Sequence, residues 1–82
     1  APTEERRKQL TRDVQKQGEE AKVAERNVRR DAMDKFKAMK KAGELTEDDQ
    51  KPLEEEIQKL TDKFDKRIDE TCATKNQEIM EV

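Results

Sequence analysis

A long stripe of apolar residues at helical spacing dominates the first half of this chain. Its members are separated by three or four residues, the period of one face of an α-helix. The stripe consists of Leu10, Val14, Gln17, Ala21, Ala24, Val28, Ala32, Phe36 and Met39, with Gln17 as its one polar member. The pattern predicts a single helix from about residue 3 to residue 41, ~60 Å long at ~1.5 Å per residue.

A second apolar stripe predicts a second helix over about residues 47–80. Its members are Leu53, Ile57, Leu60, Phe64, Ile68, Thr71 or Cys72, Lys75, Ile79 and Val82. Ala42-Gly43 provides a stop between the helices, and Thr46 with Asp49 resembles a capping box. A connection this short predicts an antiparallel hairpin, so the expected fold is all-α.

Pro52 leaves two interpretations of how the second helix begins. If Thr46 is the N-cap, Pro52 lies beyond the first turn, removes one backbone hydrogen bond and should bend the helix. Alternatively, residues 47–50 form a short turn and the main helix begins near Pro52. We favour the continuous helix with a bend near Pro52.

The composition limits the functions that such a hairpin can have. Of the 82 residues, 49% are charged and 29% hydrophobic, with two Phe and no Trp or Tyr, which is too little for a globular core. We therefore expect a thin molecule that pairs with a second copy into a four-helix bundle. No grouping of side chains suggests an enzyme or a cofactor, and the absence of His excludes an ordinary zinc site.

Cysteine content and hydropathy indicate the cellular compartment of the chain. Cys72 is the only cysteine, so an intramolecular disulfide is impossible, which fits the reducing cytoplasm. No apolar run approaches the roughly 18 residues that a membrane span requires. The chain starts at Ala1 without Met, and we interpret it as a fragment or a processed chain.

Basic residues concentrate on the first predicted helix. Between Lys22 and Lys41 there are eight basic and three acidic residues, although the whole chain has a formal charge of −2. Arg26, Arg29 and Arg30 lie within five positions, and their guanidinium groups suit phosphate binding. The alternative is a solvated face whose arginines pair with nearby carboxylates. No aromatic residues interleave with the arginines, so base stacking is not expected.

Several sequence blocks resemble bacterial ribosome recycling factor. They are Thr3-Glu-Glu-Arg-Arg-Lys8, Ala21-Lys-Val-Ala24, Arg26-Asn-Val-Arg-Arg-Asp-Ala32, Glu47-Asp-Asp49 and Ile57-Gln-Lys-Leu-Thr-Asp62. The resemblance extends over nearly the whole chain, in order and almost without gaps. The Arg-Asn-Val-Arg-Arg-Asp and Gln-Lys-Leu-Thr-Asp blocks are its most specific parts.

The resemblance implies a function in protein biosynthesis, after translation termination. The family is an L-shaped, two-domain factor that acts with elongation factor G to split the post-termination ribosome. Its long domain is a three-helix bundle that lies against large-subunit rRNA. Residues 1–82 resemble the second and third helices of that domain, while the first helix and the small α/β domain are missing. The resemblance implies that Arg26, Arg29 and Arg30 contact rRNA, with Arg29 the most important.

Two residues depart from the family pattern. Glu25 and Asp65 stand where the family usually has apolar residues, and helical phase places both at the border of their stripes. Such a narrowed stripe suits a hairpin that functions without a third helix. An engineered helical scaffold with no ribosomal role is therefore an alternative to a ribosome-binding fragment, and an unrelated coiled-coil interaction module is a weaker one.

Overall fold

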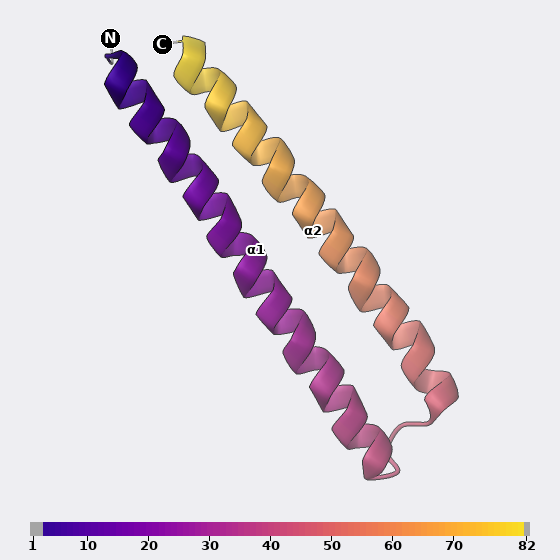
Figure 1. The fold of residues 1–82 in the computed structure, drawn as a ribbon. Coiled ribbons are helices and arrows are strands. Elements are labelled where there is room, and N and C mark those ends of the chain that lie inside the picture. Colours follow the sequence, from indigo (N-terminus) through magenta and orange to yellow (C-terminus); the bar gives the residue numbers. More distant parts are fainter. Residues whose placement is uncertain (1–2, 82) are drawn as a thin grey trace.

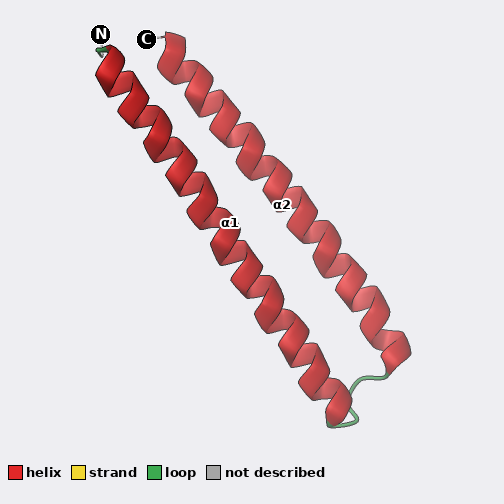
Figure 2. Ribbon diagram, in the orientation of Figure 1, coloured by secondary structure: helices red, strands yellow, loops and turns green. Residues whose placement is uncertain are grey.

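The fold is an antiparallel hairpin of two long helices. The computed structural model describes residues 3–81, in which α1 spans Glu4–Lys41 and α2 spans Glu47–Glu81. The described ends of the chain lie side by side, opposite the connecting loop (Figure 1), and residues 3–81 contain no strand (Figure 2). The predicted all-α fold is confirmed, with each helix end within one residue of its expected position. The molecule is 61 Å long.

The ends of α1 follow local sequence signals. The Thr3 hydroxyl accepts a hydrogen bond from the Arg6 N–H at 3.2 Å and so caps the helix start. At the other end, the Gly43 N–H donates to Lys40 O and the Glu44 N–H donates to Met39 O. This pair of bonds is a Schellman motif, and it requires the left-handed φ of +79° that Gly43 adopts.

The start of α2 decides between the two interpretations of Pro52. The Asp49 N–H donates to the Thr46 hydroxyl at 3.2 Å, which confirms Thr46 as the N-cap. Pro52 lies inside the continuous helix α2 rather than at its start. The continuous helix is therefore correct, and the bend at Pro52 remains a prediction.

The packing between the helices differs from the predicted stripes. No described residue is fully buried, and the contact consists of half-buried side chains. In the middle of α1 the half-buried residues are Gly18, Lys22, Glu25 and Arg29. The predicted members Gln17, Ala21, Ala24 and Val28 are exposed, as are Leu60, Phe64, Thr71 and Lys75 of α2. The prediction was wrong at these positions except the one given as Thr71 or Cys72, where the half-buried residue is Cys72. Val82 lies outside the described residues.

Geometry explains this difference. An amphipathic stripe can be wide enough to contact two neighbouring helices, whereas a hairpin supplies only one. In the middle of the molecule α2 covers one flank of the α1 stripe and leaves the other flank in solvent. Glu25 and Asp65, predicted at the stripe borders, are both half-buried.

Gly18 permits a close approach between the helices. A Cβ atom at this position would lie 2.7 Å from Cys72 Sγ. The Cys72 thiol lies 3.9 Å from the Val14 carbonyl oxygen, and its side chain is half-buried. Cys72 is thus a small packing group, and Gly18 provides the space for it.

Candidate nucleic-acid interface

The three candidate arginines have different environments. Arg26 and Arg30 are exposed. Arg29, in contrast, is half-buried beside α2. Arg29 is half-buried because α2 packs against its side of α1. Arg26 and Arg29 both line a shallow hollow of about 100 Å³ between the helices.

Hydrogen bonds hold two of the guanidinium groups. Arg29 Nη1 donates to Gln58 Oε1 of α2 at 3.1 Å. Gln58 Nε2 in turn donates to Asp62 Oδ1 at 3.0 Å. Arg30 donates to the side-chain oxygen of Asn27, one turn away on α1. Gln58 and Asp62 had no assigned role in the sequence, although both belong to the block Ile57-Gln-Lys-Leu-Thr-Asp62.

No ion pair within the described residues engages the arginine cluster. Within residues 3–81 the ion pairs are Arg7–Glu4, Lys22–Asp69, Lys40–Glu47 and Lys75–Glu78, and none involves Arg26, Arg29 or Arg30. The alternative in which nearby carboxylates neutralise these arginines therefore lacks its expected contacts. Each of the three arginines therefore still has N–H donors available for phosphate oxygens.

Two carboxylates meet at the inner side of the same hollow. Both carboxylate oxygens of Glu25 are shielded from solvent without a hydrogen-bond partner, and the Asp65 side chain faces them. Desolvation raises the pKa of Glu25. Asp65 raises the pKa of Glu25 further, because a protonated carboxyl group can donate a hydrogen bond to the other one and because the two ionised carboxylates repel each other. Arg29 opposes the shift. Because negative charge at these carboxylates would repel it, a bound anion would lie at the outer edge of the guanidinium groups, away from Glu25 and Asp65.

An ion pair beside the hollow links the two helices. Lys22 Nζ lies 2.7 Å from Asp69 Oδ1. The hydrogen bond to Asp69 raises the pKa of Lys22 above its ordinary value. Because Asp69 engages this ammonium group, Lys22 contributes less to a phosphate-binding surface than Arg26 or Arg30.

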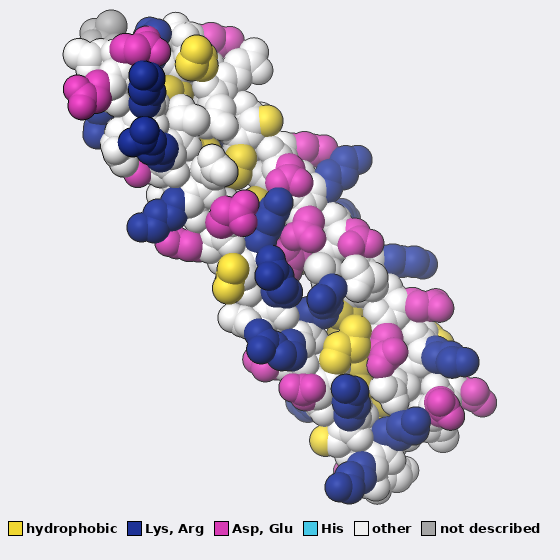
Figure 3. Space-filling view, viewed as in Figure 1, with side chains coloured by type: hydrophobic (Ala, Val, Ile, Leu, Met, Phe, Trp, Pro, Cys, Tyr) yellow, Lys and Arg dark blue, Asp and Glu magenta, His cyan; other side chains and the backbone are white. Residues whose placement is uncertain are grey.

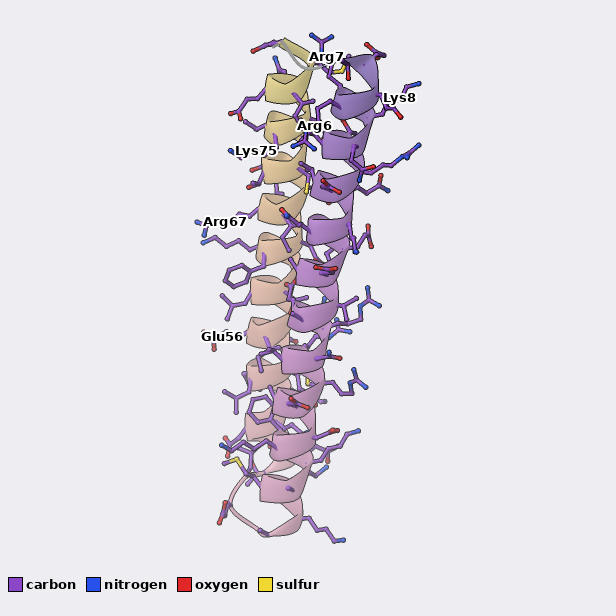
Figure 4. All side chains as sticks on the ribbon, turned by 90° about the vertical axis from the view of Figure 1, so that its left-hand side faces the viewer. Arg6, Arg7, Lys8, Glu56, Arg67 and Lys75 are labelled. Atoms are coloured by element: carbon purple, nitrogen blue, oxygen red, sulfur yellow. The ribbon has the colours of Figure 1, made fainter. Side chains whose placement is uncertain are left out.

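A shallow apolar groove follows the exposed flank of the stripes. Two adjoining hollows, of about 530 Å³ and 370 Å³, share Ala21, Phe64 and Ile68 in their walls. Val28 is 68% exposed and Phe64 52% exposed. On the face in Figure 3, hydrophobic side chains emerge in small areas among charges of both signs. Arg67 and Lys75, which line one of the hollows, project from α2 to the same side as Glu56 (Figure 4).

Residues 3–81 contain neither a membrane span nor a metal site. This part of the chain has no helix that is both long and apolar enough to cross a membrane. Over the same residues, no group of three or more acidic or Cys side chains is arranged to hold a metal ion. The arginine cluster and the apolar groove are thus the two surfaces that are suited to binding a partner.

Comparison with known proteins agrees with the resemblance in the sequence. The family model "Ribosome recycling factor" matches residues 1–80. Ribosome-recycling factor of Halalkalibacterium halodurans is 58% identical over 98% of this chain and 43% of the relative. Those of Bacillus cytotoxicus and Caldicellulosiruptor bescii are 56% and 55% identical, over 100% and 98% of this chain. The chain spans less than half of these relatives' length. It belongs to the ribosome recycling factor family.

Proposed function

We propose that this chain is a ribosome-binding hairpin, which contacts large-subunit rRNA through Arg26, Arg29 and Arg30. The observation that carries the proposal is the cluster of guanidinium groups without carboxylate partners. Guanidinium groups bind phosphates bidentately, and a charged face on a rigid helix presents them at fixed spacing. The interaction is binding without catalysis.

The proposal extends to the process in which the family takes part. Together with elongation factor G, the hairpin would help to split the post-termination ribosome in the cytoplasm. Family membership supports this role. The chain covers less than half of its relatives, so we expect its own affinity for ribosomes to be well below that of a full-length factor.

The decisive variants are Arg29→Ala and Arg29→Lys. Binding to purified large ribosomal subunits should weaken for both, because alanine removes the charge and lysine lacks the planar fork. Affinity should also fall as salt rises, since each phosphate contact releases counterions. The measurement is a salt-series titration, with circular dichroism as the folding control.

Arg67→Ala is the matched control, because it removes the same charge from an exposed site on α2. Its affinity should stay closer to that of the unmodified chain. Equal affinity for the unmodified chain, Arg29→Ala and Arg29→Lys would contradict the proposal. The engineered-scaffold interpretation would then explain the chain better.

A further inference from the structure

We infer that Gln58, held in place by Asp62, positions the Arg29 guanidinium for its phosphate partner. The inference rests on the proposed rRNA-binding function and adds two residues of α2 to a site otherwise built on α1. Gln58 is a positioning residue here, because it acts through Arg29 rather than on the nucleic acid.

The first argument is the consistency of the two hydrogen bonds. Asp62, when ionised, can only accept, so it selects the NH₂ group of the Gln58 amide at 3.0 Å. The Gln58 carbonyl oxygen then points away from Asp62 and accepts from Arg29 Nη1 at 3.1 Å. Arginine can only donate, so the same orientation of the amide satisfies both neighbours.

The second argument concerns what remains available on Arg29. A guanidinium group has five N–H donors, and the bond to Gln58 occupies a single Nη1 hydrogen. The other donors stay available for two parallel bonds to a phosphate. Gln58 is neutral and leaves the charge of Arg29 intact, which a carboxylate at this position would not.

The third argument is entropic. A free arginine side chain has many rotamers, and binding must order them at a cost in conformational entropy. A bond from the neighbouring helix restricts Arg29 before the ligand arrives. Arg30 also has a local partner in Asn27, but Asn27 belongs to the same helix and cannot connect the arginine to α2.

The test is a binding series on large ribosomal subunits with Gln58→Ala. We expect affinity to fall about three- to tenfold, the range of a single hydrogen bond. Gln77→Ala is the matched control, because Gln77 donates the same kind of bond to Glu81 on α2 at 3.2 Å and lies near the far end of α2, away from Gln58. In an Arg29→Ala background, Gln58→Ala should have no further effect.

A second readout does not depend on the ribosome. Nuclear magnetic resonance of the Arg29 Nε–Hε group should show increased side-chain motion in Gln58→Ala and unchanged motion in Gln77→Ala. Gln58→Glu should restrict Arg29 at least as strongly as in the unmodified chain and still weaken rRNA binding, because its charge offsets that of the arginine.

The outcomes separate this inference from the proposed function. If Arg29→Ala weakens binding while Gln58→Ala matches Gln77→Ala, the positioning role is wrong and the function stands. If Gln58→Ala tightens binding, Gln58 competes for Arg29, and the inference is overturned. If Arg29→Ala leaves binding unchanged, the proposed function fails, and a rise in Arg29 motion in Gln58→Ala would support the side-chain positioning alone.

Discussion

Glu25 brings a negative charge to a second carboxylate, Asp65, at the contact between two helices. Its oxygens have neither solvent nor a donor, which explains the raised pKa. The folded state therefore binds a proton more readily than the unfolded chain, so the stability that this proton provides is present at low pH. It is lost as the pH rises from the ordinary value of 4.5 through the raised pKa.

The first prediction follows from the direction in which the pKa of Glu25 is shifted. The hairpin should be more stable in mild acid than at neutral pH, as measured by thermal unfolding in a series upward from pH 4.5. Glu25→Gln should raise the free energy of unfolding at neutral pH by ~1 kcal/mol, because an amide can donate to Asp65. The same variant should flatten the pH dependence. If the stability of Glu25→Gln depended on pH in the same way as that of the unmodified chain, this explanation would be contradicted.

The second prediction concerns the contact of Gly18 with Cys72. Alanine in a helix interior is ~1 kcal/mol more favourable than glycine, so Gly18→Ala should stabilise α1 locally. The new methyl group would lie 2.7 Å from Cys72 Sγ, however, and we expect the clash to cancel that gain. In a Cys72→Ala background the gain of ~1 kcal/mol should reappear. Urea unfolding of the four variants in a double-mutant cycle measures the coupling, and additive effects would refute it.

The ends of the helices are determined by local chemistry. Thr3 and Thr46 cap the two starts, and Gly43 ends α1 in a left-handed conformation. These interactions involve residues within five positions of each other, so they form in the same way whatever the rest of the molecule does. This local origin explains why the helix bounds agree with the sequence.

The third prediction tests the stop at Gly43. Gly43→Ala should lower the free energy of unfolding by ~1 kcal/mol, because the left-handed conformation is sterically unfavourable for a residue with a Cβ atom. Nothing lies within 4 Å of the added Cβ, so the cost comes from the backbone alone. Gly43→Asn should lose less, since asparagine tolerates this conformation. Equal losses for both variants in chemical denaturation would point to another cause.

The hairpin as a whole leaves apolar surface uncovered. None of its described residues is fully buried, and its groove contains Val28, Leu60 and Phe64. A small two-helix unit gains little from such a contact, so the isolated chain should be marginally stable. A second copy can cover the groove and complete a four-helix bundle.

The fourth prediction is therefore self-association through the groove. Sedimentation velocity should show a dimer that dissociates on dilution, with helicity falling in parallel. Phe64→Glu should shift the chain to monomer, because it places a charge in the apolar groove. Ala73→Glu adds the same charge to an exposed position of α2 outside the groove and should leave the dimer intact. A well-folded monomer at high concentration would refute the prediction.

Sequence periodicity and caps were sufficient to predict two helices, their ends and their antiparallel connection. They were also sufficient to locate the basic segment that carries Arg26, Arg29 and Arg30. Each of these properties depends on residues close together in the chain, where the helical period determines which side chains share a face.

Only the tertiary structure decided which flank of each stripe α2 covers. Periodicity shows that Ala21, Val28 and Phe64 belong to apolar faces, but it cannot show which side of a wide face meets the partner helix. That choice placed Glu25 opposite Asp65 and left Val28 and Phe64 in solvent. It also brought Gln58 to Arg29, 29 residues away along the chain, because a contact between two helices depends on their relative rotation.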